Sequence, residues 1–329
     1  MKAIQFSKPG GPEVLELVEV PTPVPGPTEV LIKAHAIGVG MPEVLVRMGA
    51  YAWMPPLPAI PGIEMSGTVA ALGERVSTLE VGQPVFVSAR EFKVRGGCYA
   101  EFVAAEEKAV YALPAGVDLD EAAALSNYQV AWHLLHSATQ GFQYESVVVL
   151  AAAGGVGTAL VQLARKSGKR VIGIVDTEEK ARFALLQGCH SAVDFHGGRV
   201  AEEVRRATSG RGVDLLLDPV GGPGTSRNFE LLAPFGMLVL FGELDGPPEA
   251  NVHEALKRGA RSLAMRHFTM HTLDHRPELR SKATSELLRM LAEKIIRPPI
   301  HERIPLAEAR RAHELLEAGK VLGKLIMKP

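Results

Sequence analysis

The chain has 329 residues, of which 47% are hydrophobic and 22% charged, and its formal net charge is −1. This composition is typical of a globular protein with two well-buried domains, and the balanced charge disfavours a nucleic-acid or anionic-membrane surface. Two cysteines, Cys98 and Cys189, are too few for a disulfide framework or a four-cysteine zinc lobe. Because no segment has the apolar length of a signal peptide or a membrane span, we expect a reduced, cytoplasmic, soluble protein.

The first 120 residues or so are predicted to be rich in β-strands. Short apolar runs at 30–32, 68–71 and 84–87 are separated by Pro and Gly residues. The repeated prolines of segment 21–29 are incompatible with a helix. Short strands at this spacing indicate a small barrel or a twisted sheet.

From about residue 120, helices and strands alternate. Residues 118–138 have the apolar spacing of a helix that opens on acidic residues. We then expect strands at 147–151, 170–176, 192–195, 213–218 and 237–242, and helices at 156–166, 178–187, 200–208 and 225–232. This order predicts an α/β fold with a parallel sheet that is covered on both faces. The tail is predicted to contain helices at 282–296 and 306–319 and a strand at 321–328.

A glycine-rich turn, AAAGGVG, lies at 151–157 between the first of these strands and its helix. Written as AxGxxG, it places Ala152, Gly154 and Gly157 at the marked positions of a dinucleotide-binding turn. There Gly154 lets the backbone approach a pyrophosphate at the helix N-terminus, and Gly157 lets the helix lie close to the strand. The first position needs only a small residue, which alanine provides where φ stays negative. The alternative is a turn that merely packs a helix on a sheet.

An acidic residue, Asp176, ends the next strand, 24 positions after Ala152. A carboxylate there accepts hydrogen bonds from an adenosine ribose and repels a 2′-phosphate. With strand, turn, helix, strand and acid in order, the sequence predicts a dinucleotide-binding site. The alternative role for Asp176 is a surface cap of the following helix.

Several segments together resemble the zinc-independent quinone oxidoreductase branch of the medium-chain dehydrogenase/reductase superfamily. They are PAIPGIEMSGTVAALGERVSTLEVGQPVF (58–86), GGCYAEF (96–102), AAAGGVGTALVQLA (151–164), DPVGG (218–222) and HELLEAGKVLGKLIM (313–327). The resemblance implies a GroES-like β-rich catalytic domain, residues 1–120 with 265–329, and a Rossmann domain, residues 121–264. The predicted cofactor-binding set then also includes Gly155, Val156, Val220, Phe241 and Gly242.

Zinc is not expected in the catalytic domain. Zinc-dependent alcohol dehydrogenases of the superfamily bind the metal through a cysteine and a GHE histidine. Gly40 stands at the cysteine position here, and Ile63 at the histidine position. Without a thiolate or an imidazole, catalytic zinc has nothing to hold it. His267, His271 and His275 recur every four residues and offer an alternative metal site if that segment is helical, although Pro277 indicates irregular structure nearby.

The choice between NADH and NADPH depends on three positions. Relatives that use NADPH often carry Gly or Ser at the position of Asp176, a lysine four residues later and a tyrosine after the third strand. Lys180 matches the lysine, whereas Asp176 departs from the pattern and Phe195 lacks the tyrosine hydroxyl. A 2′-phosphate beside Asp176 would be repelled, so NADH is predicted to be preferred, with NADPH as the alternative. Lys180 could instead pair with a carboxylate.

The reacting centre is predicted from a second motif. The family's NxxDxxxRxGxY segment appears as GMPEVLVRMGAY, 40–51, in which Gly40 replaces asparagine and Glu43 replaces aspartate. Tyr51 is the leading candidate for a hydrogen bond to the acceptor carbonyl; a pocket wall is its alternative role. Gly40, Tyr51, Asn127 and Tyr128 form the predicted substrate pocket, the last two because LSNYQVAW resembles the stretch near the nicotinamide in relatives.

The sequence therefore predicts an NAD(P)H-dependent, zinc-independent oxidoreductase that transfers hydride to a quinone or an α,β-unsaturated carbonyl compound. Its expected partners are a small-molecule substrate and, by the resemblance, a second copy in a homodimer. An enoyl-thioester or enoyl-acid reductase on the same fold is an alternative. A dinucleotide-binding protein with little turnover is another, because Gly40 departs from the family's pattern.

Overall fold

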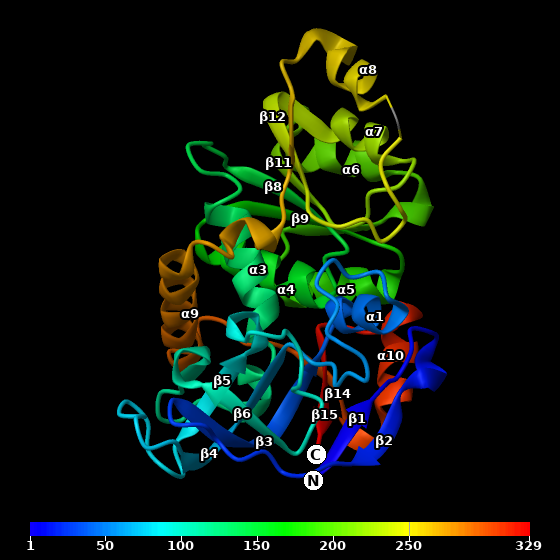
Figure 1. The fold of residues 1–329 in the computed structure, drawn as a ribbon. Coiled ribbons are helices and arrows are strands. Elements are labelled where there is room, and N and C mark those ends of the chain that lie inside the picture. Colours follow the sequence, from blue (N-terminus) through cyan, green and yellow to red (C-terminus); the bar gives the residue numbers. More distant parts are fainter. Residues whose placement is uncertain (250) are drawn as a thin grey trace. The chain divides into compact units, whose positions relative to one another are not determined.

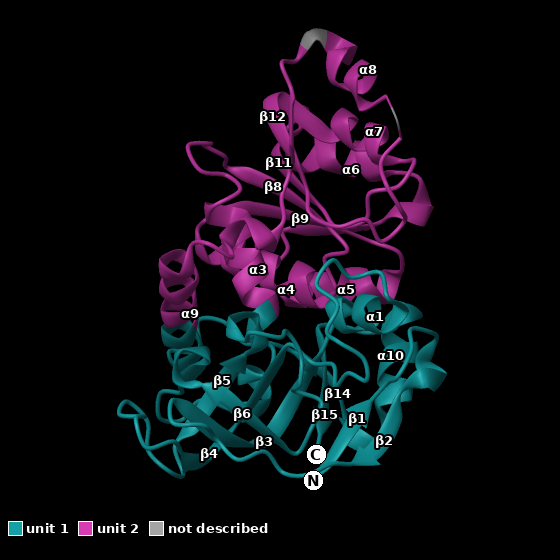
Figure 2. Ribbon diagram, in the orientation of Figure 1, with its two compact units in different colours: residues 1–126, 288–329 teal, residues 127–287 magenta. Residues whose placement is uncertain are grey.

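The computed structural model describes residues 1–249 and 251–329, which separate into two compact units (Figures 1 and 2). Unit 1 consists of Met1–Ser126 and Leu288–Pro329, and unit 2 of Asn127–Leu287. No helix among the described residues has the length and apolar character needed to cross a membrane.

Unit 1 contains a hairpin, β1–β2, and a seven-stranded sheet of order β14-β15-β3-β4-β5-β7, with β6 paired to β3. Val30, Ile32 and Ile37 of β3 and Met65 of β4 are buried, so these two strands carry the centre of its core. The strands are β1 (Lys2–Gln5), β2 (Glu16–Glu19), β3 (Glu29–Val39), β4 (Glu64–Leu72), β5 (Pro84–Ser88), β6 (Phe102–Glu106), β7 (Val110–Ala112), β14 (Ile300–Pro305) and β15 (Lys324–Lys328). The helices are α1 (Met41–Met48), α2 (Leu119–Ala122) and α10 (Ala309–Glu317).

Unit 2 is built on a six-stranded parallel sheet of order β10-β9-β8-β11-β12-β13. The strands are β8 (Ser146–Leu150), β9 (Arg170–Val175), β10 (Ser191–Asp194), β11 (Val213–Asp218), β12 (Leu232–Leu240) and β13 (Ala264–His267). The helices are α4 (Gly155–Lys166), α5 (Glu178–Leu186), α6 (Val200–Ala207), α7 (Thr225–Asn228) and α8 (Val252–Lys257). Two further helices, α3 (Leu125–His136) and α9 (Pro277–Ala292), each have residues in both units.

The predicted α/β fold with a parallel sheet is confirmed. Val147, Val148 and Val149 of β8 are all fully buried, so side chains on both faces of the strand are covered. From β8 the chain runs outward through β9 and β10 and then crosses back to β11 on the other side of β8. Such a change of direction makes the carboxyl ends of β8 and β11 the expected ligand-binding edge of the sheet.

Several helices differ from their predicted extents. Helix α9 runs over Pro277–Ala292 and so begins and ends earlier than the expected 282–296. The single helix expected at 118–138 is divided into α2 and α3 because each has its own N-terminal acceptor. Asp118 accepts from the Asp120 N–H at 2.7 Å, and the Glu64 carboxylate accepts from the Ser126 N–H at 2.8 Å. The helix expected at 225–232 is only α7, followed by a 3-10 turn, Phe229–Leu231, which leads directly into β12.

The unit boundaries also differ from the expected 120/121 and 264/265. The sheet of unit 2 does not end at residue 264, since β13 pairs with β12 over Ala264–His267. Further along, the Gln129 side chain of α3 donates to Thr284 Oγ1 of α9 at 2.7 Å, which holds most of α9 in unit 2. The chain therefore returns to unit 1 later than the sequence suggested.

Candidate functional site

The glycine-rich turn connects β8 to α4 at the carboxyl end of the parallel sheet. A Cβ at Gly157 would lie 2.1 Å from the carbonyl oxygen of Ala151, so only glycine lets the helix pass this close to the turn. Ala151 has a φ of 52°, in the left-handed region, whereas Ala152 lies outside it. The structure thus gives Gly157 its predicted packing role and agrees with a negative φ at Ala152.

Gly154 differs from Gly157, because the protein itself leaves room for a side chain there. Its φ of −77° and ψ of 175° suit any residue. The contact that its Cβ would make with described atoms is an ordinary one, 3.4 Å from the Ala151 carbonyl oxygen. Gly154 is also the N-cap of α4, and it has no side chain to accept from the N–H groups of Gly155, Val156 and Gly157. Open space before uncapped N–H groups fits the pyrophosphate of a nicotinamide dinucleotide.

Asp176 directly follows β9 and forms an ion pair with Lys180, another residue of the predicted cofactor-binding set. The Lys180 ammonium lies 2.7 Å from its carboxylate. Lys180 is held in the first turn of α5, where its N–H donates to the capping hydroxyl of Thr177 at 3.2 Å. Because the pair is formally neutral, Asp176 repels a 2′-phosphate less strongly than an isolated carboxylate would.

Phe195 lies beside that ion pair in the sheet. Asp194 of β10 is paired with Val175 of β9, so Phe195 follows β10 where Asp176 follows β9. The Phe195 side chain is 48% exposed. The structure therefore brings Phe195, Asp176 and Lys180 to the carboxyl end of the sheet, and their contact with a dinucleotide remains a prediction.

The segments after β11 and β12 meet at the same edge. The buried carboxylate of Asp218 accepts from the N–H of Val220 at 2.7 Å. The Phe241 N–H donates to the Asp218 carbonyl oxygen at 2.9 Å, and a Cβ on Gly242 would lie 2.6 Å from the Pro219 carbonyl oxygen. Val220 thus follows β11, the neighbour of β8 in the sheet, and Phe241 and Gly242 follow β12, one strand further away.

Asn127 and Tyr128 are adjacent in α3 but differ in exposure. Tyr128 is 2% exposed, and its hydroxyl donates to Gln162 Oε1 of α4 at 2.8 Å. Asn127 is partly exposed. Tyr128 therefore ties α3 to the helix that follows the glycine-rich turn, and a contact of either residue with substrate remains a prediction.

In unit 1, Gly40 is the N-cap of α1 and adjoins buried charged groups. The Glu43 carboxylate accepts from the Gly40 N–H at 3.0 Å and from the Ile63 N–H at 2.9 Å. A Cβ on Gly40 would lie 3.3 Å from Glu43 Oε2 and 3.7 Å from Lys324 Nζ. Burial raises the pKa of Glu43 to about 7, against the opposing effect of the Lys324 charge. The carboxyl at the predicted substrate side of unit 1 therefore titrates near neutrality.

Lys324 and Glu64 form a buried ion pair that the sequence analysis did not identify. Their Nζ and Oε1 atoms lie 2.5 Å apart, and the side chains are 5% and 1% exposed. The second Glu64 oxygen accepts from Ser126 at the start of α3. One feature of the sequence could have indicated that Lys324 is buried. It stands next to the apolar run Leu325–Met327, in a strand whose other side chains are largely buried.

Tyr51 lies just beyond the end of α1. Gly49, at φ 74°, terminates the helix, and the Tyr51 ring packs partly buried against the core of unit 1. Its ring centroid is 6.3 Å from that of Trp53. These contacts fix the position of the ring, and the predicted role of its hydroxyl is not tested by them.

Arg47, another residue of the same motif, is buried in a polar network. Its guanidinium donates to both Glu317 oxygens, at 2.8 and 2.7 Å, and to the Gly10 carbonyl oxygen at 3.0 Å. His313 lies beside it and contacts the Tyr99 hydroxyl at 3.1 Å. Burial lowers the pKa of His313 to about 4, and the Arg47 charge adds to this effect. Arg47 thus joins α1 to α10.

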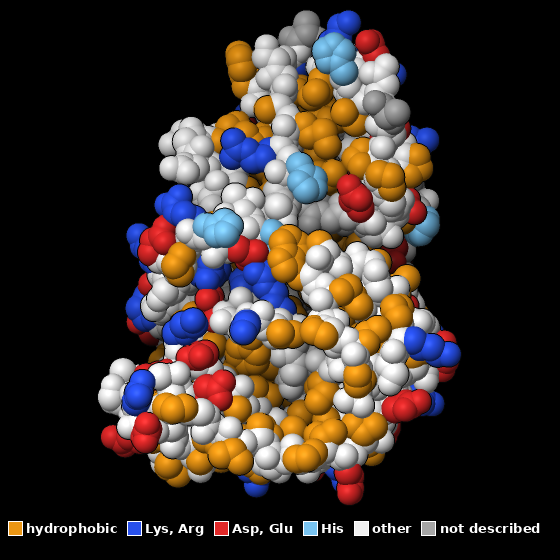
Figure 3. All heavy atoms as spheres, viewed as in Figure 1, with side chains coloured by type: hydrophobic (Ala, Val, Ile, Leu, Met, Phe, Trp, Pro, Cys, Tyr) orange, Lys and Arg blue, Asp and Glu red, His pale blue; other side chains and the backbone are white. Residues whose placement is uncertain are grey.

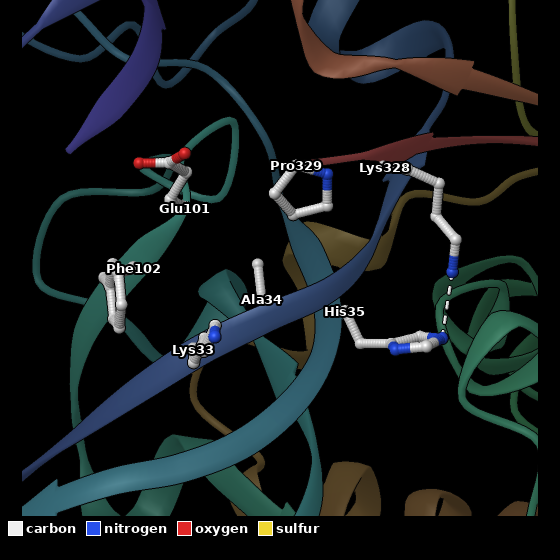
Figure 4. Close-up of a pocket in the computed structure, with 7 residues that line it drawn as sticks. All are labelled: Lys33, Ala34, His35, Glu101, Phe102, Lys328 and Pro329. Carbon is white, nitrogen blue, oxygen red and sulfur yellow. Dashed lines mark hydrogen bonds between the residues drawn. The ribbon is translucent and has the colours of Figure 1, made fainter.

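A shallow hollow of about 500 Å³ on unit 1 contains none of the predicted site residues (Figure 4). It is lined by Lys33, Ala34, His35, Glu101, Phe102, Lys328 and Pro329. His35 and Lys328 both approach Asp120, which also accepts from Arg303 at 2.6 Å. These groups largely satisfy one another, so the hollow is a surface feature of the sheet rather than a candidate reacting centre.

The positions that bind zinc in relatives have no suitable side chain here, since Gly40 and Ile63 occupy them. The three histidines of the alternative site do not share a helix. His267 lies in β13, and His271 lies in the 3-10 turn Met270–Leu273, with Nδ1 3.3 Å from Asp274. Among the described residues, no three His, Cys, Asp or Glu side chains gather closely enough to hold a metal ion.

On the face drawn in Figure 3, basic and acidic side chains are interspersed.

Comparisons with known proteins agree with this architecture. Residues 26–115 match the alcohol dehydrogenase GroES-like domain model, and residues 187–327 match the model described as zinc-binding dehydrogenase. A quinone oxidoreductase of Pseudomonas aeruginosa is 34% identical over 330 residues, which cover 100% of this chain and 99% of that protein.

Solved structures also match this chain over its whole length. The Escherichia coli quinone oxidoreductase complexed with NADPH has a TM-score of 0.88 at 28% identity and full coverage of both chains. A mycobacterial protein complexed with NADPH has a TM-score of 0.88 at 34% identity, also with full coverage of both. The chain belongs to the quinone oxidoreductase branch of the medium-chain dehydrogenase/reductase superfamily.

Proposed function

We propose that this protein binds NADH or NADPH and transfers hydride, without zinc, to a quinone or an α,β-unsaturated carbonyl compound. The observation that carries the proposal is Gly154, a glycine that leaves space before the uncapped first turn of α4. When bound, the nicotinamide supplies the hydride, and the protein's part is placement, exclusion of water and polarisation of the acceptor. The relatives named quinone oxidoreductase and the two NADPH complexes support this assignment.

A comparison of three acceptor classes tests the substrate. We expect NADPH oxidation with 1,4-benzoquinone or 2-cyclohexen-1-one to have a higher kcat/KM than oxidation with crotonyl-coenzyme A. A clear preference for crotonyl-coenzyme A would instead establish the enoyl-thioester reductase. The second candidate, a dinucleotide-binding protein with little turnover, is favoured by Gly40, where the family's asparagine amide is absent.

Tyr51 is proposed to donate a hydrogen bond to the acceptor oxygen as negative charge develops there. Replacing Tyr51 by phenylalanine removes the hydroxyl and retains the ring that packs against the core. We expect kcat to fall by about 10²-fold, with a smaller change in KM, because the bond strengthens in the transition state. An unaltered kcat would reduce Tyr51 to a wall of the pocket.

NADH is proposed to be the preferred dinucleotide, by a modest factor. The Asp176 carboxylate is suited to a ribose 2′-hydroxyl, whereas Lys180 cancels only part of its effect on a 2′-phosphate. Asp176→Ser should raise the ratio of kcat/KM for NADPH to that for NADH by about tenfold, since a like charge is removed. The same ratio in wild type and variant would contradict the argument.

The homodimer is also a proposal, and strand β13 gives it a structural basis. This strand is the last in the order of the unit 2 sheet, so one of its edges can pair with a second copy. Light scattering on the eluting protein should give twice the chain mass of 35.3 kDa. A monomer mass across the concentrations used for assay would contradict the proposal.

A further inference from the structure

The turn after β10 places an imidazole next to the position where a tyrosine was expected. His196 is exposed and directly follows Phe195. The two rings are in contact in a tilted arrangement, with centroids 4.1 Å apart and planes inclined by 39°. Phe195 has no polar atom on its side chain, so the N–H groups of His196 are the side-chain donors that this aromatic pair offers.

The backbone holds His196 close to the end of β10. Asp194 caps the 3-10 turn Phe195–Gly197, with its Oδ1 accepting from the His196 N–H at 2.9 Å. Since Asp194 pairs with Val175, the turn lies beside the residues that follow β9, Asp176 first among them. The imidazole therefore belongs to the sheet edge at which an adenosine ribose binds in this kind of fold.

The other cations near this edge are less suited to a 2′-phosphate. Lys180 is engaged with Asp176 at 2.7 Å. Arg199 follows Gly198, which has a left-handed φ of 69°, and it is the N-cap residue of α6. His196 is the basic residue next to the strand end, and it carries an N–H donor in both of its protonation states.

We propose that His196 is the specificity-determining residue that binds the 2′-phosphate of NADPH in this protein, in place of a tyrosine hydroxyl. The proposal rests on the proposed function, namely that unit 2 binds a nicotinamide dinucleotide. Such a contact would allow a chain with Asp176 at the ribose position and Phe195 at the tyrosine position to bind NADPH. NADH, which has no phosphate there, does not use the contact.

The test is the dissociation constant of each dinucleotide, measured by calorimetry or nicotinamide fluorescence without any acceptor. His196→Asn should raise the Kd for NADPH by about tenfold, the loss of one charge-assisted hydrogen bond, and leave the Kd for NADH within about twofold. Arg199→Gln is the matched control in the segment that follows the turn and should leave both constants unchanged. His196→Lys should restore the NADPH affinity that His196→Asn loses, because an ammonium can donate to the 2′-phosphate.

A second measurement, on the wild-type protein, does not depend on the variants. Raising the salt concentration should weaken NADPH more than NADH, and the difference should shrink in His196→Asn. Equal losses for both dinucleotides in His196→Asn, or a loss for NADPH in Arg199→Gln alone, would overturn the assignment. If wild type binds neither dinucleotide, the proposed function itself is wrong, which is a separate and recognisable result.

Discussion

Replacing Lys324 by methionine is expected to lower the free energy of unfolding by about 3–5 kcal/mol. The ammonium lies 2.5 Å from Glu64, and both side chains are almost completely buried. Without the ammonium, the Glu64 carboxylate remains buried near Glu43 but has lost its counter-charge. The change would appear as a lower urea midpoint with an unchanged m-value.

The loss of unfolding free energy in Lys324→Met should also depend on pH. The pKa of Glu43 in the folded protein is about 7, above its ordinary 4.5, so its ionisation costs stability as the pH rises through this interval. Removing the neighbouring ammonium raises the folded-state pKa of Glu43 further, because the Lys324 charge holds it down. The deficit of Lys324→Met should therefore be smaller at pH 5 than at pH 8.

Lys320→Met is the matched control, since Lys320 is exposed and follows α10. It should change the free energy of unfolding by no more than about 0.5 kcal/mol. A Lys324→Met protein as stable as this control at pH 8 would show that the buried pair adds little to the fold.

Gly154 and Gly157, two of the glycines in the turn after β8, should respond differently to substitution by alanine. At Gly157 the added methyl would lie 2.1 Å from the Ala151 carbonyl oxygen, so the turn or α4 must move. We expect Gly157→Ala to lower the free energy of unfolding by about 3 kcal/mol. At Gly154 the methyl would make an ordinary 3.4 Å contact, so the melting temperature should hardly change.

The expected loss at Gly154 is in cofactor binding. The methyl group would occupy the space through which a pyrophosphate approaches the first turn of α4. Gly154→Ala is predicted to raise the Kd of both NADH and NADPH by at least about tenfold, which fluorescence titration measures. If Gly154→Ala binds both dinucleotides as tightly as wild type, the turn is a packing feature only.

Local patterns were sufficient to predict the parallel sheet and the turn. The β8 run Val147–Val149 is apolar on both faces, and the glycine-rich turn follows it directly. The hydrophobic pattern and the glycines were therefore enough to place the strand and the turn. The same reasoning did not find β13, because its side chains are mostly exposed and its place in the sheet depends on pairing with β12. Strand pairing over such a separation leaves no local signature.

Partners of charged residues were the other information that the sequence did not contain. Lys180 was expected either to bind a phosphate or to pair with a carboxylate, and in the structure the carboxylate is Asp176 itself. The contact of Lys324 with Glu64 joins residues 260 positions apart. Charge pairing of this kind is fixed by tertiary packing, so a residue's type alone does not show whether its charge is available to a ligand.

The most direct measurement is the acceptor-dependent oxidation of NADH and NADPH by the purified protein after treatment with a metal chelator. The account predicts saturable binding of both dinucleotides and multiple turnovers with 1,4-benzoquinone or 2-cyclohexen-1-one, at a rate that the chelator leaves unchanged. Tight dinucleotide binding with no oxidation by any acceptor would contradict the reductase. A rate that falls on chelation and returns with zinc would contradict the zinc-independent chemistry inferred from Gly40 and Ile63.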